Sequence, residues 1–494
     1  MSHANDELRS EPAESIQTVN YQHKWLVMLA TGMGIFLSTI DTSIVNVALP
    51  TFVEYFDTTF PTVQWVVLSY LLTVTTLMLS IGRLADMLGK KRIYNSGFLV
   101  FISGSLLCGL SQSVEMLIIS RVVQAIGAAM IMALGMAIVT EAFPPNERGR
   151  ALGINGAIVS IGIIIGPSIG GLILDQFPWR WIFLVNLPVG LIGTLLVHKF
   201  VPNYKPVGGQ IFDLPGAVTM FVGLLSFLLA LTIGQRLGFT HYSVMILFVV
   251  FILCLIVFIR IETLAAQPMI DLNIFRSKLL TINLITGLMT FFSMGGITLL
   301  MPFYLQNVLD LPLREIGLLM IVTPISMGMI APISGRLSDR YGSRPIVLIG
   351  LGFLILGYLG VSTLSVDSTW LDYIIRFVPI GIGMGTFQSP NNSAVMGSAP
   401  RNRLGVVSSM LSVTRTLGQT MGVAVLGAIW SGNVFSHAGK IYVEGATAAE
   451  PLAQVLGLRD TVFIVIGLLS IAFMLAVYAL ITDRRAFNKA TLKP

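Results

Sequence analysis

Three ionisable side chains stand apart because apolar residues surround them in the sequence. Asp41 is the only carboxylate deep within a long apolar stretch, and Arg121 and Arg415 lie inside two other such stretches. A carboxylate in an apolar setting can bind and release a proton, because burial favours its neutral form and a nearby cation favours its charged form. An arginine keeps its charge, so it can only modulate a neighbour or bind an anion. These residue types allow proton exchange at Asp41 and charge pairing at the two arginines.

The apolar stretches that position these residues are long enough to cross a membrane. The chain is 54% hydrophobic and 11% charged, whereas a soluble domain has roughly a quarter charged residues. About 20 mostly apolar residues cross the hydrocarbon core of a bilayer. The sequence therefore predicts an all-α polytopic membrane protein. Its fourteen transmembrane helices are expected near 25–49, 62–82, 93–111, 116–142, 151–174, 180–199, 213–234, 241–260, 280–306, 315–335, 345–365, 372–397, 404–430 and 460–482.

The basic residues test this number of spans independently, since cytoplasmic loops are enriched in Lys and Arg. With a cytoplasmic N-terminus and fourteen spans, most of the 30 Lys and Arg residues fall on the cytoplasmic side. Those that fall outside are Arg180, Arg236, Arg314, Lys440 and Arg459. We therefore expect a bacterial plasma-membrane protein with cytoplasmic tails over 1–24 and 483–494.

A short motif occurs twice and divides the chain into two halves. The sequence GRLADMLGKKR at 82–92 returns as GRLSDRYGSR at 335–344, each time after the second span of a block of six. Two related blocks predict two six-helix bundles, over 25–200 and 280–482, with the binding site between them. The segment 201–279 would then be a linker that contains two inserted central helices.

This motif resembles the signature loop of the major facilitator superfamily. The stretches DTSIVNVALP at 41–50, RVVQAIG at 121–127, GIIIGPSIGG at 162–171 and WRWIFLVNLP at 179–188 narrow the resemblance to the fourteen-span drug:proton antiporter family. The match covers nearly the whole chain, from about Trp25 to Arg485, and departs at Ala125, where the family usually has Gly. The resemblance implies a major facilitator fold and proton-coupled export of drugs, dyes or metabolites by alternating access. It implies no enzymatic activity and no cofactor.

The resemblance also assigns a gating role to the two signature loops. In each loop an acidic residue lies between two glycines, and in the family such a loop holds the two bundles together when the protein is open outward. The alternative is a tight turn anchored by cytoplasmic charges. The residues concerned are Gly82, Asp86, Gly89, Lys90 and Arg92 in the first loop, and Gly335, Asp339 and Gly342 in the second.

The fifth span carries the family's antiporter motif. Small residues at a spacing of four allow close helix packing, and a proline kinks the helix. The resemblance implies that this packing seals the bundles against proton leak, while ordinary glycine-rich packing is the alternative. The motif residues are Gly162, Gly166, Pro167, Gly170 and Gly171.

Asp41 and Arg121 are expected at similar depth in the membrane. Asp41 lies nine residues, about 13 Å, before the outer end of its span at Pro50. Arg121 lies six residues, about 9 Å, after the outer end of its span at Glu115. We predict that Asp41 carries the exchanged proton and that Arg121 tunes it. A static ion pair, or a hydrogen bond of Asp41 within its own helix, are the alternatives.

A second group of residues is expected to line the substrate cavity. Adaptable Met side chains, an aromatic ring and amides suit a promiscuous pocket, although each is also compatible with ordinary helix packing. Arg415 would neutralise an acid or contact an anionic substrate, and the sequence favours neither. The candidates are Met33, Gln124, Met289, Phe292, Gln388, Asn391 and Arg415.

The energy source and the partners follow from what the sequence lacks. It contains no phosphate-binding loop, so transport would be driven by a gradient, and Cys108 and Cys254 suit no metal site. Three functions are considered: export of lipophilic drugs or dyes, export of a self-made metabolite such as a siderophore or antibiotic, and a sensor without flux. We expect a monomer that meets a small-molecule substrate, protons and the lipid bilayer but no nucleic acid. The loop at 431–459 offers a place for a periplasmic adaptor protein.

Overall fold

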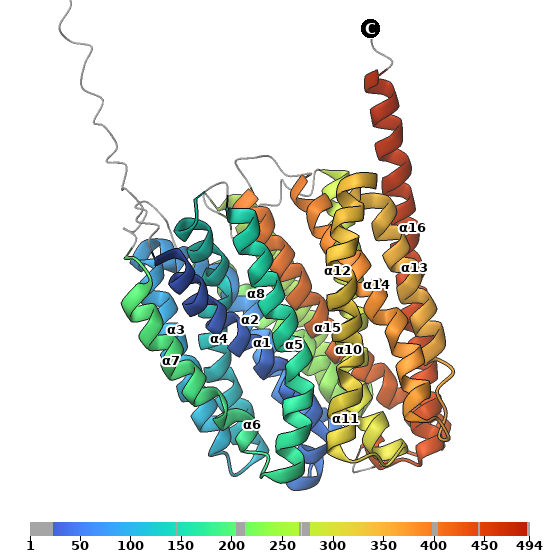
Figure 1. Ribbon diagram of the computed structural model, residues 1–494. Coiled ribbons are helices and arrows are strands. Elements are labelled where there is room, and N and C mark those ends of the chain that lie inside the picture. The colour runs from blue at the N-terminus through green and yellow to red at the C-terminus, as the bar shows by residue number, and fades with distance from the viewer. Residues whose placement is uncertain are drawn as a thin grey trace, which may run out of the picture.

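The computed structural model describes residues 23–144, 147–203, 213–265, 268, 277–397, 404–442 and 445–491. Within these ranges the chain is helical and forms no β-strand. The long helices stand side by side in two groups (Figure 1). We call the end of the molecule at which α1 begins and α16 ends the terminal end, and the opposite one the far end.

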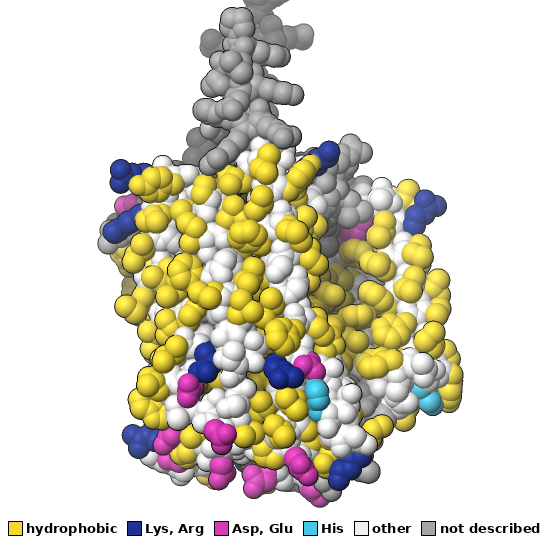
Figure 2. Space-filling view, turned by 90° about the vertical axis from the view of Figure 1, so that its right-hand side faces the viewer, with side chains coloured by type: hydrophobic (Ala, Val, Ile, Leu, Met, Phe, Trp, Pro, Cys, Tyr) yellow, Lys and Arg dark blue, Asp and Glu magenta, His cyan; other side chains and the backbone are white. Residues whose placement is uncertain are grey.

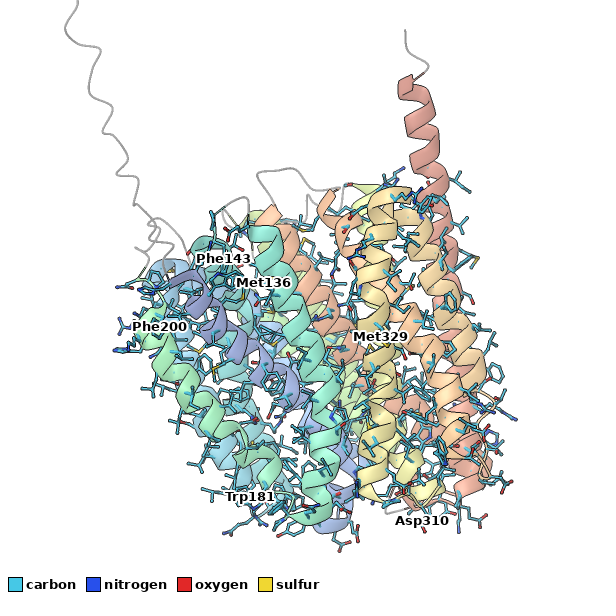
Figure 3. All side chains as sticks on the ribbon, in the orientation of Figure 1. Met136, Phe143, Trp181, Phe200, Asp310 and Met329 are labelled. Carbon is cyan, nitrogen blue, oxygen red and sulfur yellow. The ribbon has the colours of Figure 1, made fainter. Side chains whose placement is uncertain are left out.

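The first bundle contains the helices before residue 201, which pack on one another. They are α1 (Lys24–Tyr55), α2 (Phe60–Leu88), α3 (Lys90–Gly109), α4 (Val114–Ala142), α5 (Arg148–Gln176), α6 (Trp181–Leu184) and α7 (Asn186–Phe200). The last two form one interrupted span, with Trp181 at the far end and Phe200 at the terminal end (Figure 3).

The second bundle repeats this arrangement after residue 277. Its helices are α10 (Lys278–Phe303), the π-helical turn η3 (Tyr304–Val308), α11 (Leu313–Met320), α12 (Val322–Tyr341), α13 (Ser343–Val361), α14 (Trp370–Gly397), α15 (Leu404–Ala438) and α16 (Pro451–Thr491). In the described chain, each of the fourteen predicted spans corresponds to one long helix or to two consecutive helices. Ten of these helical segments are long and apolar enough to cross a membrane by composition alone.

Two further helices lie between the bundles in the sequence. α8 (Leu214–Leu237) packs against α2 of the first bundle and α15 of the second, while α9 (Tyr242–Leu264) packs mainly on α8. The only described residues of α9 that are buried are Val244 and Glu262, and its mean hydropathy reaches 3.3. α8 therefore covers one side of the seam between the bundles, and α9 forms an apolar outer layer over it.

The signature motif produces the same turn in both bundles. α2 and α3 meet at Gly89 with φ 97° and ψ 126°, and α12 and α13 meet at Gly342 with φ 84° and ψ 153°. Side chains rarely tolerate such positive φ values, which explains why glycine occupies both positions. The sequence repeat is thus a structural repeat at the terminal end.

The connection between the last two spans is shorter than predicted. α15 continues to Ala438 and α16 begins at Pro451, so the loop expected over 431–459 is reduced to 439–450. Ala446 and Ala449 of this loop are buried, and the backbone of Gly445 lies near Phe60. The prediction was wrong because hydropathy marks where an apolar run ends, whereas a helix continues for as long as its backbone hydrogen bonds are satisfied. Little free loop remains for an adaptor protein.

The surface has an apolar band between two charged ends. Figure 2 shows hydrophobic side chains over most of the visible face, with acidic side chains gathered at the lower, far end. His437 Nε2 of α15 and Asp460 Oδ2 of α16 are 2.7 Å apart. Asp460 begins the span predicted over 460–482, but it lies inside α16, because that helix starts at Pro451.

Candidate functional site

Asp41 is completely buried in the middle of the first bundle and accepts three side-chain hydrogen bonds. Arg121 Nη1 of α4 donates to Asp41 Oδ2 at 2.6 Å. Gln124 Nε2 and Asn186 Nδ2 donate to Asp41 Oδ1 at 2.7 Å and 2.9 Å. The exposed fraction of each of these side chains is 2% or less. The ion pair that the depths of Asp41 and Arg121 predict is therefore present, and its role in proton coupling stays a prediction.

A second layer of contacts fixes the donors themselves. Ser105 Oγ accepts hydrogen bonds from Gln124 Nε2 at 2.9 Å and from Asn186 Nδ2 at 3.0 Å. Arg121 donates from Nη1 to Gln124 Oε1 at 2.6 Å and from Nε to the Val66 carbonyl oxygen at 3.1 Å. We call Asp41, Ser105, Arg121, Gln124 and Asn186 the carboxylate network. If one contact is lost, a buried polar group is left without a partner, and this destabilises the folded protein. Such a network is therefore held tightly.

The aromatic surroundings of Arg121 complete its environment. The guanidinium carbon lies 4.1 Å from the centroid of the Tyr70 ring and 5.8 Å from that of Phe183. A cation over an aromatic face is stabilised without a second anion. Asp41 is thus the only carboxylate that pairs with Arg121 in the described chain.

Local features of the sequence bring the network together. The interruption between α6 and α7 at Val185 places Asn186 at the start of a new helix, and Pro188 suits that first turn because its missing N–H is not needed there. On α3, Gly104 lies against the backbone of Gln124, so α3 and α4 approach closely. This approach brings Ser105 within reach of Gln124.

Ser105 and Asn186 were not predicted from the sequence, and Gln124 was predicted to line the substrate cavity. The structure corrects that assignment, because Gln124 is buried inside the first bundle and bonded to Asp41. Asn186 could have been identified from the sequence, because it is a polar residue two positions before Pro188 in an otherwise apolar run. A small serine in a membrane helix gives no comparable signal, because it usually bonds within its own helix.

The second bundle has positions equivalent to those of the network. Gly104 faces the backbone nitrogen of Gln124, and Gly357 faces that of Ile380 in the same way. Ser105 and Tyr358 each follow the glycine, so they correspond to each other. Arg121 and Phe377 each lie three residues before the contacted residue, so they correspond as well. The repeat therefore places aromatic rings where the first bundle places a hydroxyl and a cation.

The equivalent of Asp41 follows from the neighbouring pair of helices. Gly166 of α5 meets the carbonyl oxygen of Ile40, and Gly422 of α15 meets that of Phe292. The residue after each carbonyl is Asp41 in α1 and Ser293 in α10. The described residues at the equivalent sites of the second bundle thus carry no charge.

A cavity between the bundles lies beside these uncharged positions. α1 and α5 contribute one wall, and α10 to α14 contribute the other. None of its lining residues is charged. Its volume of about 70 Å³ holds a few water molecules, whereas drug-sized ligands occupy roughly 300–1,000 Å³. The lining includes Ser43, Asn46, Met294, Met301, Met320, Tyr358, Tyr373 and Phe377.

The predicted cavity residues lie outside the lining of this cavity. Met289 and Phe292 are partly buried and pack against the apolar core. Asn391 is buried, with its amide 3.3 Å from where a Cβ on Gly287 would lie. Met33, Gln388 and Arg415 are partly buried. Most of these residues lie nearer to the terminal end than the cavity does.

The glycines of the antiporter motif have two different contact surfaces. Gly162, Gly166 and Gly170 face α1, where a Cβ would meet Thr39, Ser43 and Ile44. Pro167 and Gly171 instead face α11 of the other bundle. The motif therefore packs α5 within its own bundle on one side and joins the two bundles on the other.

The far end is closed by direct contacts between the bundles. A Cβ on Gly171 would lie 2.6 Å from the Leu313 carbonyl oxygen, so the two backbones touch there. Gln64 Nε2 of α2 donates to the Val423 carbonyl oxygen of α15 at 2.5 Å. Phe60 packs edge to face against both Phe303 and Trp430. Side chains and backbone thus block passage at this end.

The glycines of the signature turns make no such contact at the terminal end. No atom of the described residues lies within 4 Å of a Cβ position on Gly82, and Gly335 meets only Ser389 of its own bundle. Gly82 therefore makes no close contact with the second bundle in this conformation. Lys90 pairs with Glu141 within the first bundle, and Asp339 is exposed. The side chain of Asp86 lies outside the described part, and the gating role stays a prediction.

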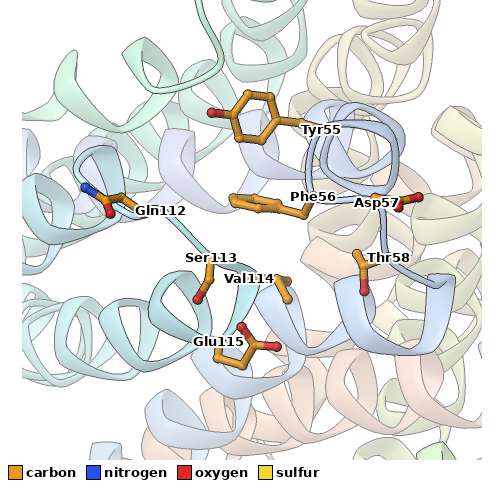
Figure 4. Close-up of a pocket in the computed structure, with 8 residues that line it drawn as sticks. All are labelled: Tyr55, Phe56, Asp57, Thr58, Gln112, Ser113, Val114 and Glu115. Carbon is orange, nitrogen blue, oxygen red and sulfur yellow. The ribbon is translucent and has the colours of Figure 1, made fainter.

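A second hollow lies on the far surface and belongs to one bundle only. It has a volume of about 450 Å³ and lies between the α1–α2 and α3–α4 connections (Figure 4). Its lining includes Tyr55, Asp57 and Glu115, all from the first bundle. Because the second bundle does not contribute to it, relative movement of the bundles would not open or close it.

Comparisons with known proteins agree with this geometry. The family model described as Major Facilitator Superfamily matches residues 31–423. The chain is 37% identical to "Riboflavin transporter RibZ" of Clostridioides difficile, over 83% of this chain and 89% of that protein. It is 33% identical to "Multidrug transporter protein MdtP" of Bacillus subtilis, over 88% and 82%. It is 34% identical to "Multidrug resistance protein Stp" of Mycobacterium tuberculosis, over 82% and 75%.

Solved structures share the fold at low sequence identity. A bacterial homologue of the human lysosomal transporter Spinster, in an inward-facing and unoccupied conformation, matches with a TM-score of 0.63 and 17% identity, over 93% of this chain and 97% of that one. An auto-inhibited peptide transporter of the POT family matches with a TM-score of 0.64 and 16% identity, over 92% and 97%.

Proposed function

Because this chain belongs to the Major Facilitator Superfamily and is a multi-pass membrane transporter rather than an enzyme, we propose that it exports small lipophilic drugs, dyes or toxic compounds in exchange for protons. The observation that carries this proposal is the carboxylate network. It contains one buried acid at mid-depth in the bundle, and that acid is held by donors that favour its charged form. The multidrug transporters among its relatives support the substrate class.

The proposed mechanism uses a change in the surroundings of Asp41. A neutral Asp41 would no longer attract Arg121, so proton binding would loosen the contacts among α1, α4 and α7. Any conformation that separates Asp41 from Arg121 therefore binds a proton more tightly, and proton binding favours that conformation by linkage. Arg121 stays charged throughout and modulates the affinity for the proton.

The proposed transport step is a rocking of the two bundles about the central cavity. Closure at the far end supports a conformation that opens at the terminal end, as does the lack of contact between the bundles at Gly82 and Gly335. We place the terminal end in the cytoplasm, on the basis of the basic residues. Substrate would enter from there or from the inner leaflet, and the cavity would expand as α5 and α11 separate.

A vitamin or a self-made metabolite is a second candidate substrate. The specific observation is the 37% identity to a protein named as a riboflavin transporter. The uncharged, methionine-rich and aromatic lining of the cavity suits a planar ring system of either kind, because methionine and aromatic side chains adapt to flat apolar surfaces.

Purified protein in proteoliposomes tests the proposal. An imposed pH difference should drive the accumulation of a lipophilic dye or of riboflavin, and a protonophore should abolish it. Accumulation that ignores the protonophore would show that protons do not drive the transport. Absence of any flux, with folded protein in the membrane, would favour a sensor.

A further inference from the structure

Arg415 lies near the middle of the membrane in the second bundle. The neighbouring residues Thr414 and Gly418 pack against Gly287 and Leu288 of α10. Leu288 is ten residues after the start of α10, which corresponds to about 15 Å along the helix. Half of a hydrocarbon core of about 30 Å is the same distance. Arg415 therefore lies close to mid-depth, as Asp41 does in the first bundle.

No acidic residue in the described part of the chain balances this charge. Asp41 already pairs with Arg121 in the other bundle. In the second bundle, Asp372 pairs with Arg376 and Asp460 pairs with His437. Among the described residues, no carboxylate oxygen forms an ion pair with Arg415. An unpaired cation at this depth is costly, so its presence indicates a partner that arrives from outside the chain.

The region beside Arg415 also contains a polar group that lacks a partner. Asn391 Oδ1 is buried without a hydrogen-bond partner among the described residues. Asn391 and Thr414 both lie within 4 Å of where a Cβ on Gly287 would be. Thr414 is the residue before Arg415 in α15. The side chain of Arg415 itself is partly exposed. This layer is therefore incomplete without a ligand.

The uncharged cavity lies on the same helix towards the far end. Met294 of its lining is seven residues from Gly287, about 10 Å along α10. A molecule of ordinary drug size can therefore place an apolar ring system near Met294 and a charged group near Arg415. The two sites would recognise different parts of one ligand.

We propose that Arg415 binds an anionic group of the transported molecule, so that the substrates are amphipathic anions with a flat apolar body. This inference rests on the proposed transport function and specifies its substrate class. A cationic molecule of the same shape would place its charge beside the guanidinium and bind more weakly. Selectivity for charge would then come from one residue, and accommodation of the apolar body from the cavity.

Two fluorescent dyes with the same xanthene core test this assignment. Fluorescein is an anion at mildly alkaline pH, and rhodamine 6G is a cation. Fluorescein should bind purified protein more tightly than rhodamine 6G does. Arg415→Gln should weaken fluorescein binding by about tenfold or more, as expected for the loss of a charged hydrogen bond, and leave rhodamine 6G binding equal or stronger. Arg415→Lys should keep part of the preference.

The control is Arg376→Gln, because Arg376 is in the same bundle but is already paired with Asp372 and Thr363. It should leave both dyes unaffected. No binding of fluorescein to the wild type, or an equal effect of Arg415→Gln on the two dyes in monodisperse protein, would overturn the assignment. Equilibrium binding needs no gradient, so loss of proton coupling alone would leave these results unchanged.

Discussion

Asp41 combines complete burial with hydrogen bonds from Arg121, Gln124 and Asn186, and these two influences oppose each other. Burial favours the neutral acid, while the guanidinium and the two amides favour the carboxylate. Modest movement of any donor therefore changes the proton affinity of Asp41. This balance is the physical basis for assigning proton exchange to one residue of the network.

Asp41→Asn should abolish uphill transport while the protein still folds and reaches the membrane. The amide has nearly the shape of the carboxylate but cannot exchange a proton, so coupling is lost and downhill exchange of substrate remains. The measurement is dye accumulation in proteoliposomes under an imposed pH difference. Asp175→Asn, an exposed residue of α5 at the far end, is the matched control. Normal accumulation by Asp41→Asn would place the proton carrier elsewhere.

Asn186→Ala should change the pH dependence of transport. Asn186 donates to Asp41 Oδ1, so its removal takes one hydrogen bond from the proposed proton carrier. The readout is the pH of half-maximal transport rather than its maximal rate. Asn433→Ala removes an amide that instead bonds Thr461 at the far end, and it should leave the profile unchanged. If Asn186→Ala and Asn433→Ala give the same pH of half-maximal transport, Asn186 contributes only to packing.

At this scale the sequence predicted the ion pair but not its support. Asp41 and Arg121 are rare charges in apolar runs, and the distance of each from its helix end was enough to match their depths. Ser105 and Asn186 contact them through the rotation of α3 and the interruption before α7. Neither the rotation of a helix nor a local break in it follows from hydropathy.

At the scale of whole helices, glycine positions determine how the bundles meet. Pro167 and Gly171 of α5 touch the backbone of α11 around Gly317, which leaves no room for a side chain. The glycines on the other face of α5 hold it to α1. A single helix therefore connects α1, which carries Asp41, to the contact that closes the far end.

Gly317→Val should prevent closure of the far end and so reduce turnover strongly. A side chain there would meet Pro167 and Gly171, so the bundles would stay apart. The measurement is the distance between spin labels at the exposed positions Gln112 and Asp367, one on each bundle. We expect a longer distance than in the wild type. Gly467→Val, at a position with no described neighbour within 4 Å, should change neither distance nor turnover.

Helix number was predictable, while helix ends were not. The apolar runs located each span, since every one of them needs about 20 residues in the membrane. The extensions of α15 to Ala438 and of α16 from Pro451 lie outside the predicted spans. The cavity was also missed, because its lining depends on how two bundles face each other and not on the properties of any one span.

At the scale of the whole molecule, the two bundles share a fold but differ in chemistry. The first places a charged network at mid-depth, and the second places Ser293, Tyr358 and Phe377 at equivalent positions. In the proposed function, the first bundle would hold the exchangeable proton, while the second lines most of the cavity. Proton and substrate would then be separated in space and coupled through the movement of the bundles.

The orientation of the molecule gives a direct prediction. The terminal end should face the cytoplasm, because most Lys and Arg residues outside the spans belong to it. A cysteine at Thr491 should therefore resist a membrane-impermeant reagent in intact cells. Cysteines at the exposed positions Glu315 and Ala448 of the far end should react. The reverse pattern would invert the direction of transport, and a mixed pattern would contradict the number of spans.

The unbalanced charge of Arg415 has a consequence for energetics. If a monoanion leaves the cell while one proton enters, each cycle moves two elementary charges across the membrane in the same electrical direction. A potential of about 100 mV contributes roughly 2.3 kcal/mol per charge, so it would contribute about twice that per cycle. A potassium diffusion potential, negative inside and without any pH difference, should then drive fluorescein export from proteoliposomes. An exporter of cations with the same proton exchange would gain nothing from that potential, so the membrane voltage itself distinguishes the two classes of substrate.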